Sequence, residues 1–170
     1  MTPVQLTEEE IANHSYTTPD GTIVPMLKGF SQELGIQFVS ASSEGAEARM
    51  PITDKIRQPF GFVHGGATLA LLETVGSQAA ACTIDLSVER VFGIRMDVRH
   101  RKSGKEGWVH GVARLSHEKG PHQYWEVTAY DDEGDVMSEG IFETKRVTLA
   151  YLAEKEARRQ AEKAAESAGE

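Results

Sequence analysis

The stretch Gln58-Pro-Phe-Gly-Phe-Val-His-Gly-Gly-Ala-Thr-Leu-Ala-Leu-Leu-Glu73 decides the fold of this chain of 170 residues. It begins polar and rich in glycine and then becomes a run of apolar helix formers that continues to Ile84. An apolar run of this length predicts a buried helix. Gly65 and Gly66 lie at its start, where glycine allows close backbone approach and leaves amide N–H groups accessible.

Glu73 is the only residue between Gly61 and Ile84 that carries a formal charge at neutral pH. A single carboxylate in so apolar a helix needs a partner or a function. We interpret Glu73 as the catalytic group and the Gly65 end of the helix as the end that binds the electrophile. From position alone, a structural carboxylate that is held in a salt bridge or is partly exposed is an equal alternative.

The segments on both sides of this helix predict β-strands. Alternating apolar residues and turn signals place two strands before the helix and four after it. Short turns between consecutive strands require antiparallel pairing, and one long apolar helix needs a sheet wrapped around it. The predicted class is therefore α+β, with strands near 36–40, 46–52, 94–99, 108–117, 122–130 and 136–147.

The two ends of the chain differ from this core. Residues 6–16 predict a short helix with a capping box, and residues 25–34 predict a second short helix or an irregular packing segment. Residues 148–170 are rich in Ala, Glu, Lys and Arg and predict a helix, either a solvated tail or a helix docked on a neighbouring subunit. We expect an N-terminal extension over 1–27, a core domain over 28–147 and a charged C-terminal helix over 148–170.

Composition limits the classes of function. The net charge of −8 argues against nonspecific nucleic-acid binding. Cys82 is the only cysteine, so no intrachain disulfide is expected, which fits a reducing compartment. The acidic N-terminus is unlike a signal peptide, and no apolar stretch is long enough for a membrane span. We expect a cytoplasmic protein.

The motif Gln58-Pro-Phe-Gly-x-x-His-Gly-Gly-Ala, with Glu73 following on the helix, resembles a known family. The chain is similar to the hotdog-fold acyl-CoA thioesterases of the phenylacetate-degradation and 4-hydroxybenzoyl-CoA type. Within them it most resembles the bacterial 1,4-dihydroxy-2-naphthoyl-CoA thioesterases of menaquinone biosynthesis. The resemblance covers residues 30–147, and further matching positions are Gly76-Ser77, Val91-Phe-Gly-Ile94, His100, Lys105-Glu-Gly107, Trp108-Val-His-Gly-Val112 and His122-Gln-x-Trp125.

The resemblance implies a hotdog fold, in which an antiparallel sheet wraps a central helix. Two subunits join their sheets edge to edge, and the dimers pair into homotetramers. It implies hydrolysis of an aromatic or medium-sized acyl-CoA, such as a dihydroxynaphthoyl, hydroxybenzoyl or phenylacetyl thioester, to the free acid and coenzyme A. No metal or redox cofactor is implied. The alternative is a hotdog protein that binds acyl-CoA without turnover.

The resemblance places the active site between two subunits. Glu73 comes from one subunit, as nucleophile or as general base on a water, and Gln58 and the His-Gly-Gly turn come from the other. The Gly65 N–H would stabilise the oxyanion, Gln58 would orient the thioester or the water, and His64 would hold the loop. Ser77, one helical turn after Glu73, would position the water or Glu73. The alternative for Gly65 is a simple tight turn. The alternative for His64 is a structural histidine, and that for Ser77 is a helix-packing serine.

Coenzyme A also carries phosphates, and a local basic run that includes Arg101 and Lys102 could meet them. Lys102 occupies a family position that is usually Arg, and solvated surface charge is the alternative. Gly120-Pro121 departs from the Ser-Arg pair of relatives. The histidines have no metal-ligand spacing, so we expect no metal site. The expected substrate-binding residues are Gly66, His100, Arg101, Lys102 and His122.

Overall fold

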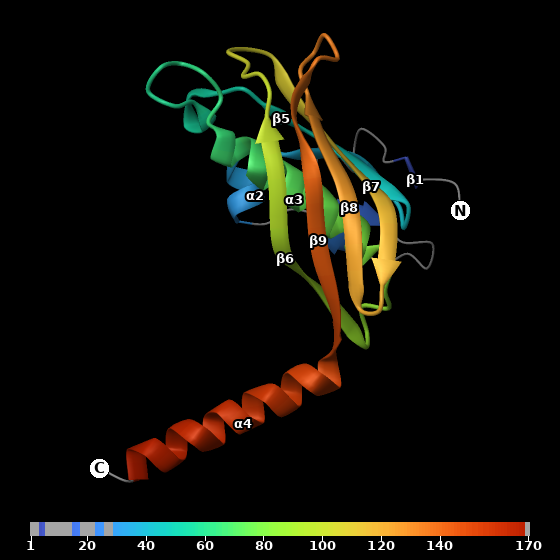
Figure 1. The fold of residues 1–170 in the computed structure, drawn as a ribbon, viewed down its shortest axis with the longest axis vertical. Helices are drawn as coiled ribbons and strands as arrows, with labels where there is room; N and C mark the ends of the chain where they lie inside the picture. Colours follow the sequence, from blue (N-terminus) through green and yellow to red (C-terminus); the bar gives the residue numbers. More distant parts are fainter. Residues whose placement is uncertain (1–3, 6–14, 18–22, 26–28, 169–170) are drawn as a thin grey trace.

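The computed structural model describes residues 4–5, 15–17, 23–25 and 29–168. Its main feature is an antiparallel sheet of seven strands in the order β1-β4-β5-β7-β8-β9-β6, wrapped around helix α3 (Figure 1). A separate pair is formed by β2 and β3. The bounds are β1 Val4–Gln5, β2 Ser15–Thr17, β3 Ile23–Pro25, α2 Phe30–Glu33, β4 Gln37–Ala41, β5 Gly45–Pro51, α3 Gly65–Ala81, β6 Glu89–His100, β7 Trp108–Lys119, β8 His122–Tyr130, β9 Val136–Thr148 and α4 Leu149–Ala168. The predicted α+β class, with one central helix, is confirmed.

Helix α3 buries one face against the concave side of the sheet. Leu71, Leu72 and Val75 are fully buried there, together with Trp125 and Phe142 from the sheet. Gly76 contacts the Phe142 ring so closely that a Cβ atom at position 76 would overlap it. A small residue at this position therefore lets the helix lie against the sheet.

The strand predictions are confirmed in number and order within the core, and one boundary differs. Strand β6 begins at Glu89, before the alternating residues that begin at Ile94. The pairing of β6 with β9 shifts between Gly93 and Arg95, which interrupts the period-two pattern. The alternation therefore indicated only the second half of the strand.

The prediction of a helix over 6–16 falls mostly outside the described residues. Residues 15 and 16 belong to β2, so the helix does not extend to them. Aromatic and β-branched residues favour a strand in this short segment. Among the described residues of the second predicted helix, Pro25 belongs to β3, and the single turn α2 over Phe30–Glu33 is helical.

A buried polar network explains part of the His122-Gln-x-Trp125 motif. The Gln123 amide donates to Thr83 Oγ1 at 2.7 Å and to Glu118 Oε1 at 2.9 Å. Thr144 Oγ1 donates to Gln123 Oε1 at 3.1 Å and accepts from Trp125 Nε1 at 3.1 Å. The network ties the residues after α3 to the middle of the sheet, because each buried polar group needs a partner.

Strand β6 forms one edge of the sheet (Figure 1). It spans 12 residues, and Phe92 and Ile94 on it are each 48% exposed, with Val88 just before it 54% exposed. A long, apolar, unpaired edge is a ready template for pairing with another strand. Pairing of this edge with a second protomer stays a prediction.

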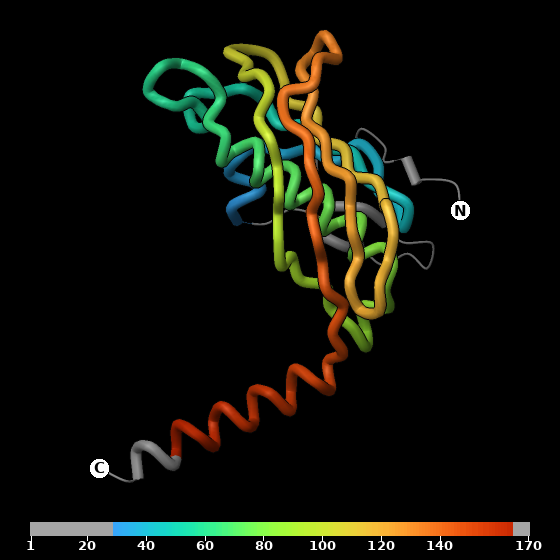
Figure 2. The backbone as a smooth tube through the Cα atoms, in the orientation of Figure 1, coloured from blue at the N-terminus to red at the C-terminus, as the bar shows by residue number. Residues whose placement is uncertain are grey.

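Helix α4 extends away from the sheet (Figures 1 and 2). The Leu149 N–H donates to the Val88 carbonyl at 2.9 Å, and nearly all side chains from Ala150 to Ala164 are exposed. The predicted C-terminal helix is present, and its docking on a neighbour stays a prediction. Within the described residues, no helix is long and apolar enough to cross a membrane.

Candidate active site

A loop between β5 and α3 carries two of the predicted site residues, Gln58 and His64. Its backbone is closed by the Gln58 N–H, which donates to the Phe62 carbonyl at 2.8 Å, and by the His64 N–H, which donates to the Ile56 carbonyl at 2.7 Å. The Gln58 side chain is half-buried and has no hydrogen-bond partner in the part of the chain that the structure describes. The loop therefore fixes the start of α3 and leaves the Gln58 amide available.

His64 caps the N-terminus of α3. Its backbone is extended, and its Nδ1 accepts a hydrogen bond from the Gly66 N–H at 2.9 Å. Nδ1 is therefore unprotonated in this arrangement. Because the Gly66 N–H is used by the cap, the Gly65 N–H is left as the donor without a partner among residues 29–168. That donor points out of the positive end of a helix of 17 residues.

His100 lies against Gly65. A Cβ atom at position 65 would lie 2.9 Å from His100 Nε2. The ring is held on its other side by a hydrogen bond of 2.8 Å between Nδ1 and Ser138 Oγ. The structure thus brings together Gly65 and His100, two residues expected to be catalytic and substrate-binding, respectively.

Glu73 lies on the face of α3 that the sheet does not cover. Its side chain is exposed, although most of the helix around it is apolar and its sheet-facing side is buried. No hydrogen bond or ion pair holds it within the described residues. A Cβ atom at Gly93 would lie 3.1 Å from Glu73 Oε1, so the carboxylate reaches the edge strand β6.

A groove of about 590 Å³ runs between α2 and α3. Glu73 and Ser77, one helical turn apart, both line it, as predicted from their spacing. Phe30 on α2 also lines it, and sequence reasoning missed this residue because its proximity to α3 is tertiary. The complete lining is Phe30, Ser31, Gly66, Leu69, Ala70, Glu73, Thr74, Ser77 and Gln78.

Glu73 and the Gly65 N–H belong to different parts of α3. They lie eight residues apart on one helix, which corresponds to about 12 Å along its axis. Among the residues that the structure describes, neither group has a hydrogen-bond or ion-pair partner. The family resemblance places such an acid and such a donor on different subunits, and that arrangement stays a prediction.

Arg101 and Lys102 already have partners. Lys102 Nζ lies 2.5 Å from Asp131 Oδ2 and 2.6 Å from Asp135 Oδ2. The hydrogen bonds to Asp131 and then Asp135 raise the pKa of Lys102 far above its usual range. Arg101 pairs with Glu139. A phosphate contact by either cation stays a prediction, and it would require the cation to leave or share a carboxylate.

His122 lies at the far end of the sheet from His100. His122 pairs with Lys145 of β9, whereas His100 pairs with Ser138. Ser138 and Lys145 are seven positions apart on β9, which corresponds to about 23 Å along the strand. One chain therefore does not unite His122 with the residues near Gly65. His122 instead contacts Glu143, with 2.6 Å between Nδ1 and Oε1, and this hydrogen bond is the main cause that lowers the pKa of Glu143.

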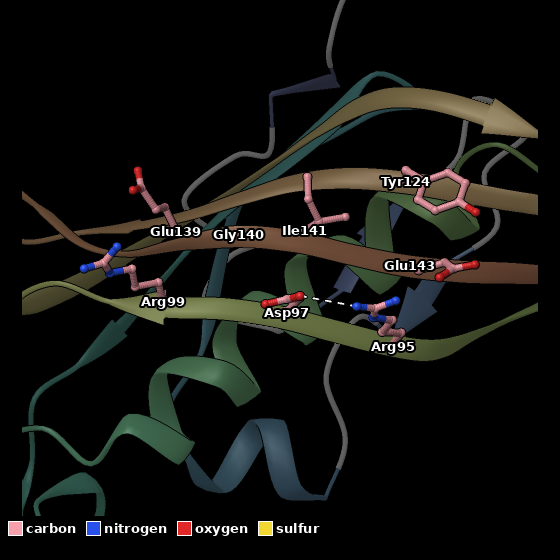
Figure 3. A pocket seen from close by; sticks show the side chains of 8 residues that line it. All are labelled: Arg95, Asp97, Arg99, Tyr124, Glu139, Gly140, Ile141 and Glu143. Atoms are coloured by element: carbon pink, nitrogen blue, oxygen red, sulfur yellow. Dashed lines mark hydrogen bonds and ion pairs between the residues drawn. The ribbon is translucent and has the colours of Figure 1, made fainter.

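A second groove, of about 460 Å³, lies on the face of the sheet turned away from α3 (Figure 3). Arg95 and Asp97 form an ion pair of 3.3 Å on its floor. Burial and then the Glu143 charge raise the pKa of Tyr124 beside them. This groove contains neither Glu73 nor the start of α3, and its lining is Arg95, Asp97, Arg99, Tyr124, Glu139, Gly140, Ile141 and Glu143. Among the residues described, no cluster of His, Cys, Asp and Glu has metal-binding geometry.

Comparison with known proteins places these features in a family. The family model of the thioesterase superfamily matches residues 60–138. The chain is 35% identical to a 1,4-dihydroxy-2-naphthoyl-CoA hydrolase of Escherichia coli K12 over 119 residues, which cover 70% of this chain and 83% of that protein. It is 34% identical to the putative esterase ComA2 of Bacillus subtilis over 121 residues, covering 71% of this chain and 92% of that protein.

Solved structures agree with the sequence relatives. A mutant thioesterase from Pseudomonas aeruginosa superposes with a TM-score of 0.69 at 29% identity, over 72% of this chain and 88% of that one. A thioesterase from Haemophilus influenzae superposes with a TM-score of 0.66 at 26% identity, over 70% of this chain and 82% of that one.

Proposed function

Because this chain belongs to the thioesterase superfamily, we propose that it hydrolyses an aromatic or medium-sized acyl-CoA to the free acid and coenzyme A, at a site shared by two protomers. One observation carries the shared site. Within the described part of the chain, neither Glu73 nor the Gly65 N–H has a partner, and about 12 Å of helix separates them. A second chain is needed to bring an acid to a donor.

Antiparallel pairing of two β6 edges supplies this geometry. The Glu73 carboxylate lies beside Gly93, and Gly65 lies beside His100. In a two-fold pair of β6 strands centred between Met96 and Asp97, Gly93 of one protomer lies opposite His100 of the other. The acid of one protomer then faces the start of α3 in its partner, and the exposed Phe92 and Ile94 become covered. Two such dimers would form the homotetramer.

The chemistry follows from that pairing. The Gly65 N–H at a helix N-terminus donates to the thioester oxygen as negative charge develops on it. Glu73 either attacks the carbonyl carbon, which expels the CoA thiolate and leaves a mixed anhydride for water to cleave, or removes a proton from the attacking water. In both routes one water is consumed, the C–S bond breaks, and the acid and the thiol are released. Gln58 orients the thioester or the water, and Ser77 shares the groove with Glu73.

The lining of the groove between α2 and α3 favours particular acyl groups. Phe30, Leu69 and Ala70 provide an aromatic and an aliphatic wall next to Glu73. Such a lining suits an apolar ring, and orientation then comes from a few polar groups such as Ser77. The E. coli relative is named for a bicyclic aromatic thioester, so we place 1,4-dihydroxy-2-naphthoyl-CoA, and with it menaquinone biosynthesis, first among the candidates. Hydroxybenzoyl-CoA and phenylacetyl-CoA follow. These substrates and the reduced single cysteine fit a cytoplasmic enzyme.

The test is a panel of thioesters with detection of the released thiol. We expect kcat/KM for 1,4-dihydroxy-2-naphthoyl-CoA, benzoyl-CoA and phenylacetyl-CoA to exceed that for short aliphatic acyl-CoA. Glu73→Ala should lower kcat by orders of magnitude with an unchanged circular dichroism spectrum. A wild-type protein that binds acyl-CoA without releasing thiol would reject the enzymatic function and favour the non-catalytic binding protein.

A further inference from the structure

Residues 101–105 form a bridging segment between the active-site loop and the rest of the sheet. The Val63 N–H donates to the Gly104 carbonyl at 2.9 Å. The Ser103 hydroxyl donates to the Val63 carbonyl at 3.0 Å. Both backbone polar groups of Val63, two residues before Gly65, are therefore held by this segment.

The same loop is held at a second point by Arg57. Its guanidinium donates to the Lys105 carbonyl through Nη2 at 2.7 Å and through Nε at 3.2 Å. Nη1 pairs with Asp54 at 2.5 Å within the loop. The bridging segment thus contacts the loop on both sides of Gln58-Pro-Phe-Gly-Phe62, which leaves Gln58 between two fixed points.

The other side of the bridging segment is anchored on the β8–β9 hairpin. The N–H groups of Arg101 and Lys102 donate to the Met137 carbonyl at 2.8 and 3.2 Å. Lys102 Nζ joins Asp131 and Asp135, which flank the hairpin turn. The Asp131 carboxylate is itself fixed, because it accepts from the N–H groups of Glu133 and Asp135 at 3.2 and 2.8 Å.

We infer that Lys102, Ser103 and Arg57 are positioning residues, which hold the loop of Gln58, His64 and Gly65 in register with the sheet. The inference rests on the proposed function, since it assigns these residues to placing the oxyanion donor. An oxyanion donor must be fixed before the reaction to be effective. A displacement of about 1 Å can cost up to about 100-fold in rate. Lys102 therefore acts through the loop and not through the phosphates of coenzyme A.

Loop positioning by Lys102 and phosphate binding by Lys102 predict different kinetic effects, the first on kcat and the second on KM. We expect Lys102→Met to lower kcat about tenfold or more, equally for an acyl-CoA and for the matching acyl-pantetheine thioester, which lacks the nucleotide phosphates. Asp135→Asn should also lower kcat, but by a smaller factor, because Asp131 still holds the Lys102 amine. The double variant should be less than additive, as expected for groups in one network. Lys155→Met, on the exposed α4, is the matched control and should leave both rates unchanged.

Variants of Ser103 distinguish a loss of loop positioning from a general loss of protein stability. Ser103→Ala should lower kcat with little change in KM, and Ser103→Thr, which keeps the hydroxyl, should restore it. Amide hydrogen exchange at Val63 should accelerate in Lys102→Met and Ser103→Ala but not in Lys155→Met. This readout needs no substrate, so it tests the inference even if the proposed function fails.

The outcomes are distinguishable. A wild-type protein without thioesterase activity on the panel overturns the proposed function alone. An active wild type with unchanged kcat and unchanged Val63 exchange in Lys102→Met overturns the inference. A rise in KM for acyl-CoA but not for acyl-pantetheine, with kcat retained, also overturns it and assigns Lys102 to the phosphates.

Discussion

The Gly65 N–H can be removed without removing the helix that presents it. Proline is well tolerated at the first position of a helix, and His64 already has the extended backbone that a residue before proline prefers. Gly65→Pro therefore deletes the proposed donor and keeps α3. Because Gly65→Ala also meets the His100 ring but keeps its N–H, it is the matched control.

We expect Gly65→Pro to lower kcat about 100- to 1000-fold relative to Gly65→Ala, the usual loss for one oxyanion donor. Steady-state kinetics on a thioester that the wild type hydrolyses gives the ratio, and circular dichroism checks that both variants keep the helix. Equal rates in the two variants would show that the glycine matters for space alone.

At the scale of elements, the β8–β9 hairpin links pH to stability. The hydrogen bond from Lys102 lowers the pKa of Asp131, and the hydrogen bond from His110 lowers that of Asp132. A carboxyl group whose pKa is lower in the folded state binds protons more readily when unfolded. Such a group therefore contributes fully to the free energy of unfolding above the ordinary aspartate pKa of about 3.9. This contribution is lost as the pH falls through the lower pKa that the group has in the folded state.

The resulting prediction concerns acid unfolding. These aspartates should not change the midpoint urea concentration of unfolding between pH 7 and pH 5. Below about pH 4 the midpoint should fall steeply. Asp131→Asn should lower the midpoint at pH 7 and flatten its decline in acid, whereas Asp97→Asn, in an exposed pair, should behave like wild type. A midpoint for Asp131→Asn that declines as steeply as that of wild type would contradict this role.

The elements themselves were largely predictable from local pattern. The apolar run after Gly65 and the alternation in the later strands identify α3 and the sheet, because burial on one face imposes their periods. The exposure of Glu73 was not predictable, since it depends on which face of α3 the sheet covers. The partners of Lys102 were not predictable either, because Asp135 lies 33 residues further along the chain. Motif similarity proposed the acid and the donor, and only the tertiary structure shows which residues hold the loop before that donor.

At the scale of the whole molecule, the proposal makes each protomer incomplete. Its Glu73 serves the site at the start of the partner's α3, so each site of a dimer takes its acid and its donor from different chains. A Glu73→Ala protomer still offers an intact donor, and a Gly65→Pro protomer still offers an intact acid. Each variant alone should be nearly inactive, because every site in its homodimer lacks one group.

Co-expression of the two variants should restore activity. Random pairing makes about half of the dimers mixed, and each mixed dimer has one site with both groups intact, so about a quarter of wild-type activity is expected. Separate affinity tags allow the mixed dimer to be isolated, and its kcat per dimer should be about half that of wild type. The control is a mixed dimer of wild type with the Glu73→Ala,Gly65→Pro double variant. In this dimer each site lacks either the acid or the donor, so no activity is expected from it. Inactive mixed dimers of the two single variants would require acid and donor to come from the same chain, which the 12 Å spacing along one helix opposes.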